Sequence, residues 1–131
     1  MTVEPKRPAI VIAEDDEDVA RLLAEALTTE LGADPVLVTN GALVIDAVVA
    51  SAARLLVLDV QMPGASGIDV YDVVRGHPIL AEIPVLFVTA DPATALETLP
   101  GRAPRAVIGK PFDVDALLAK VRELLGDAVQ A

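Results

Sequence analysis

Four short apolar runs along the chain each end in polar residues. The runs and their polar ends are Ala9–Ala13 with Glu14-Asp15, Leu55–Leu58 with Asp59, Val85–Val88 with Thr89, and Ala106–Gly109 with Lys110. Short runs rich in β-branched residues are typical of strands that are buried on both faces of a parallel sheet. The carboxyl ends of parallel strands lie along one edge, where open α/β folds bind ligands. We therefore expect these polar side chains to converge.

The segments between the runs show the spacing of amphipathic helices. A first helix, ending near Gly32, is predicted by the apolar stripe of Val19, Leu22, Leu23, Ala26, Leu27 and Leu31. Further helices are predicted over Gly41 to Ala50, over about Ile68 to Arg75, and after Pro111, with a short strand at Val36–Val38. Residues 93–99 could form about two helical turns between prolines. The pattern predicts five βα units in one doubly wound α/β domain.

Composition narrows the class of protein. The chain has 131 residues and is 53% hydrophobic but only 2% aromatic, so we expect a single domain (1–131, core about 8–126) packed on aliphatic side chains rather than on rings. The absence of cysteine excludes disulfides, thiolate zinc sites and thiol catalysis. No apolar run approaches the ~18 residues of a membrane span, and the N-terminus lacks the apolar core of a secretory signal. We expect a cytoplasmic protein without membrane insertion.

The net charge of −10 also bears on possible partners. Such a surface repels the nucleic-acid backbone, and there are few rings to stack on bases. Direct binding of DNA or RNA is therefore disfavoured. Nothing resembling a DNA-binding segment follows residue 126, so either the output is another protein or the chain was cut from a longer one.

Three carboxylates at the predicted sheet edge indicate a metal site. Glu14, Asp15 and Asp59 would repel one another there and raise one another's pKa unless a cation lay between them. Oxygen ligands with incomplete protein coordination favour Mg²⁺, which keeps several waters and bridges to phosphate. The neighbouring acids, residues 16–18, are better explained as the negatively charged first turn of a helix.

The remaining polar ends fit phosphoryl chemistry. Asp59 beside Mg²⁺ can act as a nucleophile and form an aspartyl phosphate, although an isolated Asp at a strand end can also be a turn former. Thr89 taken alone would be a strand or capping residue, and Lys110 a solvated surface charge. Facing three acids, the ammonium of Lys110 would instead neutralise a transferring phosphoryl group.

Four segments carry a family resemblance. Their order and spacing resemble the response-regulator receiver domain of two-component signalling over about residues 8–126, and they read IVIAEDDEDVARLL, LLVLDVQMPGASGIDV, VLFVTA and KPF. The resemblance implies a flavodoxin-like fold with a five-stranded parallel sheet of order 2-1-3-4-5. It also implies that the protein is not an enzyme in the usual sense, since it would catalyse only its own phosphorylation and dephosphorylation.

The same resemblance implies roles for the residues at the sheet edge. Asp59 would be the phosphoacceptor, with a histidine kinase or a histidine phosphotransfer protein as donor and another protein as downstream target. Asp15 would bind Mg²⁺ directly, Glu14 through water, and Gln61 through its backbone carbonyl. Thr89 and Lys110 would bind the phosphoryl oxygens, and the Lys110–Pro111 peptide bond is expected to be cis. Gln61 and Asp91 would flank the water that hydrolyses the acyl phosphate.

Two departures from the family pattern concern how phosphorylation is read out. The family commonly carries Tyr or Phe three residues before the lysine, a position occupied here by Val107. The fourth helix is shortened by Pro92, Pro100 and Pro104. These departures motivate an alternative function: a receiver-fold interaction module whose output does not depend on phosphorylation.

Two other classes fit the residues less well. A phosphatase of the haloacid-dehalogenase type needs a second Asp two residues after the nucleophile, and Gln61 stands there. A Rossmann-type nucleotide binder needs a glycine-rich turn after the first strand. Glu14 to Asp18 occupy that turn and would repel a phosphate.

Overall fold

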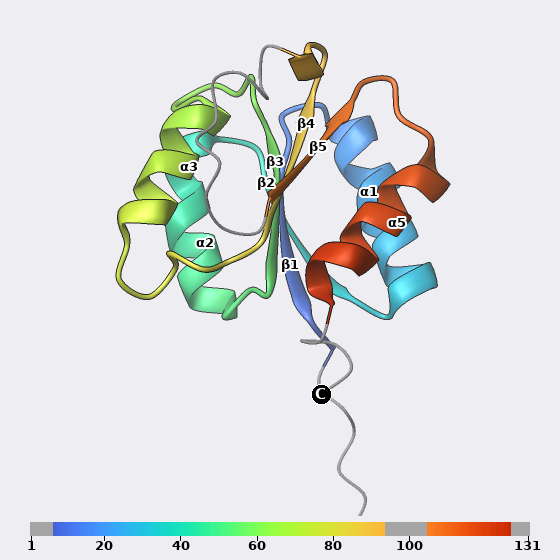
Figure 1. Cartoon of the computed structure of the whole chain (residues 1–131), viewed down its shortest axis with the longest axis horizontal. Coiled ribbons are helices and arrows are strands. Elements are labelled where there is room, and N and C mark those ends of the chain that lie inside the picture. Colours follow the sequence, from blue (N-terminus) through green and yellow to red (C-terminus); the bar gives the residue numbers. More distant parts are fainter. Residues whose placement is uncertain (1–6, 94–104, 127–131) are drawn as a thin grey trace, which may run out of the picture.

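The fold is built on one parallel sheet. A computed structural model describes residues 7–93 and 105–126. The strands are β1 (Ala9–Ala13), β2 (Asp34–Val38), β3 (Leu55–Asp59), β4 (Val85–Thr89) and β5 (Arg105–Gly109). They pair in the order β2-β1-β3-β4-β5, all parallel. Figure 1 shows the sheet nearly edge-on, between the helices. The predicted fold class and strand order are confirmed.

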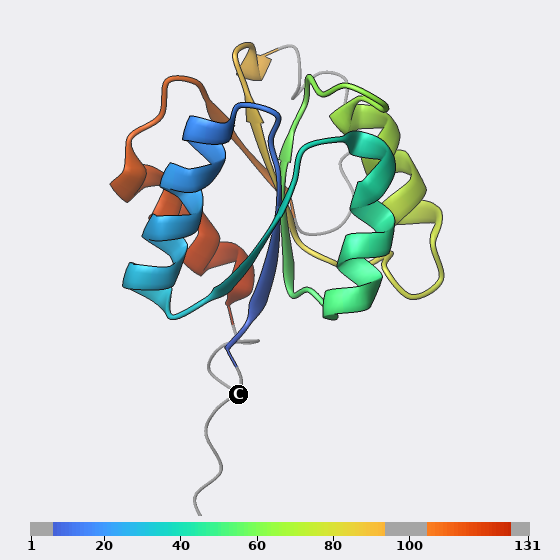
Figure 2. The same ribbon diagram turned by 180° about the vertical axis from the view of Figure 1, so that it is seen from behind.

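Helices cover both faces of the sheet. They are α1 (Glu17–Leu31), α2 (Val44–Ser51), α3 (Gly67–Gly76) and α5 (Val114–Leu125), with a short 3₁₀ helix η1 (Gly41–Leu43) before α2. Helices α1 and α5 lie on one face, and α2 and α3 lie on the other (Figures 1 and 2). The helix predicted over residues 93–99 falls outside the described residues from residue 94 onward. Within 7–93 and 105–126, no helix has the length and apolarity needed to cross a membrane.

Burial on both faces explains the unbroken apolar runs. Every residue of β3 and β4 is buried. Along β1, Ile10 and Ile12 pack on the side of α1 and α5, whereas Val11 and Ala13 pack on the side of α2 and α3. Alternate side chains therefore enter two separate cores, and a strand of this kind has no solvent face on which polar residues would be tolerated.

The core beneath α2 and α3 contains aromatic rings. Tyr71 and Phe87 are both fully buried and meet edge to face, with their ring centroids 5.0 Å apart. The guanidinium of Arg75 lies 4.6 Å from the centre of the Tyr71 ring. The prediction of a core packed without rings is therefore wrong on this face. The low aromatic content misled because two buried rings, Tyr71 and Phe87, are enough to form an aromatic contact inside a small core.

Both ends of α1 have the capping residues that the sequence indicated. The Asp16 side chain accepts hydrogen bonds from the amides of Asp18 and Val19, which confirms its interpretation as a helix-capping acid. At the other end, Gly32 adopts the left-handed conformation (φ 62°), for which glycine is favoured.

The predicted helix over Gly41 to Ala50 is wrong in its first turn. That turn is the 3₁₀ helix η1, and the α-helix begins only at Val44. The side chain of Asn40 accepts the amide of Ala42, and the amide of Gly41 donates to the carbonyl of Pro63 in the loop after β3. These contacts hold the first turn in a tighter conformation, and hydrophobic spacing gives no sign of them.

Candidate functional site

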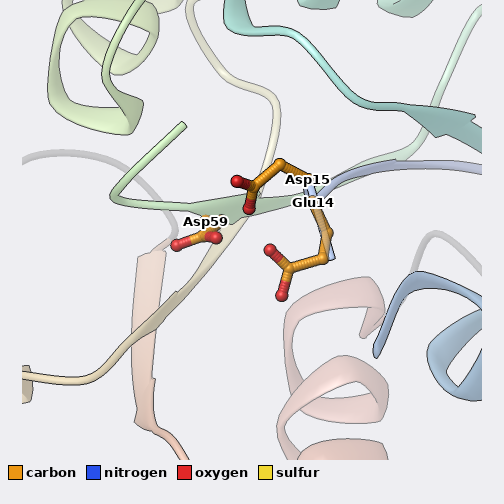
Figure 3. A group of neighbouring side chains, drawn as sticks. All are labelled: Glu14, Asp15 and Asp59. Atoms are coloured by element: carbon orange, nitrogen blue, oxygen red, sulfur yellow. The ribbon is translucent and has the colours of Figure 1, made fainter. Parts of the chain in front are cut away.

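Three carboxylates converge where β1 and β3 end. Ala13 pairs with Leu58 in the register of these neighbouring strands, so Glu14 and Asp59 emerge at the same level. Glu14, Asp15 and Asp59 each offer an oxygen, and these oxygens lie within 4.8 Å of one another. Figure 3 shows the three side chains around a common space. The convergence expected from parallel strand ends is therefore observed for the acids.

Lys110 enters this cluster from the end of β5. Its ammonium nitrogen lies 2.7 Å from Glu14 Oε1 and 3.3 Å from Asp59 Oδ2. The backbone amide of Lys110 donates to the carbonyl of Thr89 at 2.7 Å, which holds the ends of β4 and β5 together. The Lys110–Pro111 peptide bond is cis, as expected. Lys110 is therefore paired with the acids and is not a solvated surface charge.

Burial makes the cluster electrostatically unusual. Glu14 and Asp59 are only 2% and 5% exposed, whereas Asp15 is exposed. Burial, assisted by the neighbouring Asp59, raises the pKa of Glu14 to about 7 against the opposing effect of Lys110. Burial also acts to lower the pKa of Lys110, but its contacts with Glu14 and Asp59 outweigh burial, and that pKa is raised.

The cluster suits a divalent metal ion. Glu14 Oε1 is bonded to Lys110, but Glu14 Oε2 is buried and has no hydrogen-bond partner among the described residues. A buried carboxylate oxygen without a partner is costly, and a cation nearby would remove that cost. Three hard oxygen donors from Glu14, Asp15 and Asp59 match the ligands that such ions prefer.

The loop after β3 supports Asp59 from the other side. The amide of Gln61 donates to Asp59 Oδ1 at 3.0 Å, while the Gln61 side chain is exposed. The amide of Gly67 donates to the carbonyl of Val60 at 2.8 Å, which closes the loop at the start of α3. The Asp59 carboxylate is therefore held by an amide on one oxygen and by Lys110 on the other.

Thr89 lies on the strand next to Asp59. Asp59 pairs with Val88, so Thr89 is one residue beyond this level on β4, and it is 4% exposed. Its hydroxyl oxygen accepts the amide of Asp91 at 3.1 Å. All six residues predicted from sequence thus lie at one edge of the sheet, namely Glu14, Asp15, Asp59, Gln61, Thr89 and Lys110.

The contact between the loop after β2 and the loop after β3 was not predicted from the sequence. Gly41 lies against the backbone of Ala65 so closely that a Cβ at position 41 would overlap the Ala65 carbonyl. Gly64, with φ 88°, lies in the same way against the side chain of Asn40. The available signal was glycine in two loops, but nothing in the sequence indicated that the loops touch.

Comparison with known proteins identifies the class. The family model for the response regulator receiver domain matches residues 10–122, so the chain belongs to that family. It is a receiver domain of a two-component response regulator, a class whose members interact with histidine kinases and act as regulators rather than as classical enzymes.

Particular relatives agree with this class. The chain is 33% identical to an uncharacterized transcriptional regulatory protein, YkoG, of Bacillus subtilis, over 88% of this chain and 50% of that protein. It is 31% identical to the DNA-binding response regulator MtrA of Mycobacterium tuberculosis, over 94% of this chain and 53% of that protein. The chain thus spans about half the length of these curated relatives.

A solved structure supports the same assignment. A putative response regulator from Chloroflexus aurantiacus superposes with a TM-score of 0.83 at 26% identity, covering 92% of this chain and 98% of the other. Here the similarity extends over nearly the whole length of both chains.

Proposed function

We propose that the domain receives a phosphoryl group on Asp59 from the phosphohistidine of a histidine kinase or a histidine phosphotransfer protein. The observation that carries the proposal is the position of Asp59, a buried carboxylate bonded to Lys110 at 3.3 Å and grouped with Glu14 and Asp15. A carboxylate held between a cation and a cluster of metal-type ligands is suited to attack phosphorus.

The transfer needs little covalent chemistry from the protein. One Asp59 carboxylate oxygen forms a bond to phosphorus while the bond from phosphorus to the donor imidazole nitrogen breaks and its electron pair stays on the imidazole. Lys110 neutralises charge on the phosphoryl oxygens, and the Thr89 hydroxyl donates a hydrogen bond to one of them. The geometry of the strand ends supplies the positioning, because Asp59 and Thr89 are the last residues of β3 and β4 and Lys110 follows β5, the next strand in the sheet.

Mg²⁺ is the cofactor that this proposal assigns to the acidic cluster. Asp15, Asp59 and the backbone carbonyl of Gln61 would hold the ion directly, and Glu14 would hold it through water. An ion held there would supply positive charge opposite the phosphoryl oxygens. The second carboxylate oxygen of Glu14 is buried without a partner among the described residues. An ion bound nearby would offset the cost of burying this oxygen.

Hydrolysis of the acyl phosphate would end the signal. Gln61 and Asp91 are both exposed and follow β3 and β4 by two residues each, beside Asp59 and Thr89. We assign them to the flanks of the attacking water, where their side chains would set the lifetime of the phosphorylated state.

The decisive experiment uses acetyl phosphate as a small phosphoryl donor, with Mg²⁺ present. Intact-mass spectrometry of the whole chain should show addition of one phosphoryl group, and Asp59→Asn should abolish it. The matched control is Asp34→Asn, which removes an exposed acid from β2 and should label like the parent. Addition of a phosphoryl group to the Asp59→Asn variant would refute the assignment.

The proposal also covers location and partners. We assign the domain to the cytoplasm. We also assign it a protein as its direct target, because a net charge of −10 opposes contact with a nucleic-acid backbone. The relatives named for transcription or DNA binding are about twice as long as the region they share with this chain. Their names therefore describe larger proteins.

A second candidate function rests on Val107. This half-buried side chain packs against the core beneath α2 and α3, in the position where the family usually has a mobile ring. A small aliphatic residue there favours an output that does not depend on phosphorylation. Beryllofluoride, a mimic of the phosphoryl group, discriminates between the two functions: equal affinity for the partner with and without it favours the second candidate.

A further inference from the structure

Two apolar grooves lie along the side of the molecule formed by α2 and α3. The first, which we call the Val73 groove, has a volume of about 190 Å³, and its lining includes Ala42, Ile45, Ala65, Asp69 and Val73. The second, the Ile79 groove, has a volume of about 450 Å³, and its lining includes Val49, Ala52, Ile79, Leu80 and Ile83. Helices α2 and α3 lie side by side in both views of the molecule (Figures 1 and 2).

The two grooves follow one another along α2, which lines both of them, and we treat them as one strip. Ile45 faces the Val73 groove, whereas Val49 and Ala52 face the Ile79 groove. These positions are three and four residues apart, so they share one face of the helix. From residue 42 to residue 52 the strip is about 15 Å long, which equals the length of roughly three helical turns.

The strip is rich in exposed apolar side chains. Over 7–93 and 105–126, six large hydrophobic residues are prominently exposed, and three of them line these grooves. Their exposed fractions are 50% for Val49, 54% for Val73 and 79% for Ile79. Exposed apolar side chains gathered in one strip are typical of a surface that binds another chain.

The charge beside the strip is acidic. Asp69 lines the Val73 groove, and Asp46 and Asp72 are exposed on α2 and α3. The nearest cation on these helices, Arg75, is directed inward, where its Nη1 donates to the carbonyls of Ala81 and Ile83, both at 2.9 Å. Arg54 lines the far end of the Ile79 groove. Within residues 7–93 and 105–126, no ion pair neutralises Asp46, Asp69 or Asp72, so this half of the strip is negatively charged.

We propose that this strip, the α2–α3 surface, binds a basic amphipathic helix of a partner protein. Apolar side chains of that helix would occupy the two grooves, and its Lys and Arg residues would face Asp46, Asp69 and Asp72. A second copy of this chain in a symmetric dimer would bring these acids against one another, and an anionic membrane would be repelled by them. This inference goes beyond the proposed function and does not depend on phosphorylation of Asp59.

The test is a titration of the whole ¹⁵N-labelled chain with a synthetic 14-residue peptide in which Leu and Lys form an amphipathic helix. Amide resonances of α2, α3 and residues 77–84 should shift. A peptide of the same composition with its sequence scrambled, and hence without an apolar face, should bind at least about tenfold more weakly.

Variants separate the apolar from the electrostatic contribution. Val73→Asn combined with Ile79→Asn should weaken binding about tenfold, whereas the control Leu22→Asn with Leu37→Asn, which removes two exposed apolar residues elsewhere, should leave it within about twofold. Asp46→Asn with Asp72→Asn should weaken binding more than Glu25→Gln with Glu30→Gln, an equal charge change on α1. All these side chains are exposed, so we expect the variants to fold. The spectrum of each variant without peptide verifies that the fold is retained.

Four results would overturn the proposal. The first is a set of shifts centred on α1 or α5, and the second is equal binding of the ordered and scrambled peptides. The third is a concentration-dependent dimer in analytical ultracentrifugation that Val73→Asn with Ile79→Asn abolishes, which would make a second copy the occupant. The fourth is binding to vesicles containing anionic lipid that the same variant abolishes, which would make the occupant a membrane.

Discussion

The ammonium of Lys110 lies 2.7 Å from the carboxylate of Glu14, although the two residues are 96 positions apart in the chain. The contact arises because β1 and β5 both end at the same edge of the sheet. Lys110 thereby supplies one positive charge to a group of three carboxylates. Because one cation faces three carboxylates, we expect the stability of the protein to depend on added Mg²⁺ and on pH.

Removal of Lys110 should destabilise the protein and increase its response to Mg²⁺. Lys110→Ala leaves Glu14 and Asp59 buried without their cation, and we expect it to lower the free energy of unfolding by about 1–3 kcal/mol. Added Mg²⁺ should then stabilise the variant more than the parent, since the ion would replace the missing charge. Urea denaturation with EDTA or with Mg²⁺ measures both effects. Lys120→Ala on α5 is the control, and an equal Mg²⁺ response in all three proteins would contradict the prediction.

The raised pKa of Glu14 predicts a pH dependence of stability without metal. The folded protein holds the Glu14 proton more tightly than the unfolded chain, because the pKa rises from 4.5 to about 7 on folding. The resulting stabilisation is fully present below pH 4.5 and is lost as the pH rises through about 7. Glu14→Gln should therefore be more stable than the parent at pH 8 in EDTA, by on the order of 1–3 kcal/mol, and equal to it near pH 4.

The control for this pH profile is Glu17→Gln, which removes an exposed acid from the first turn of α1. Its urea midpoints should follow those of the parent at every pH. Parallel profiles for Glu14→Gln and the parent would show that Glu14 does not carry the effect.

The hydroxyl of Thr89 should matter for phosphorylation more than for folding. Thr89→Ala removes the donor assigned to a phosphoryl oxygen, and we expect labelling by acetyl phosphate to slow by about tenfold or more. Thr89→Ser keeps the hydroxyl and should retain most of the rate. Time-resolved intact mass gives the rates, with Thr39→Ala, an exposed threonine after β2, as control. If Ser and Ala variants slow equally, the methyl group rather than the hydroxyl is important.

The contact between Gly41 and Ala65 predicts a strong positional effect of alanine. Gly41→Ala would place a Cβ against the Ala65 carbonyl, and we expect a loss of about 1–3 kcal/mol in the free energy of unfolding. Gly76→Ala meets nothing within 4 Å at the end of α3 and should be neutral or slightly stabilising. Urea denaturation compares them, and similar midpoints for the two variants would show that the loops separate readily.

Much of the sheet and its polar edge was predictable from local pattern. The strands β1, β3 and β4 are apolar on both faces and end in polar residues, so hydrophobicity alone marked their limits. Parallel pairing then placed Glu14, Asp15, Asp59, Thr89 and Lys110 at one edge without any knowledge of distances. The capping role of Asp16 followed in the same way from its position before a helical stripe.

What could not be predicted depends on contacts between segments distant in sequence. The pairing of Lys110 with Glu14 requires the relative heights of β1 and β5, and η1 depends on the hydrogen bond from Gly41 to Pro63. The packing of Tyr71 on Phe87 likewise joins α3 to β4. Periodicity describes one element at a time, and it carries no information about such pairs.

The close packing of Gly41 on the loop after Asp59 has a thermodynamic consequence. Gly41 begins η1 at one end of the α2–α3 surface, and its amide is bonded to Pro63 in that loop. The two segments are therefore in direct contact, and we expect a change in one to affect the other. If phosphorylation changes the affinity of that surface for its partner by some factor, linkage requires the partner to change the equilibrium of phosphorylation by the same factor. A bound partner would then act on the receiver as an effector in its own right.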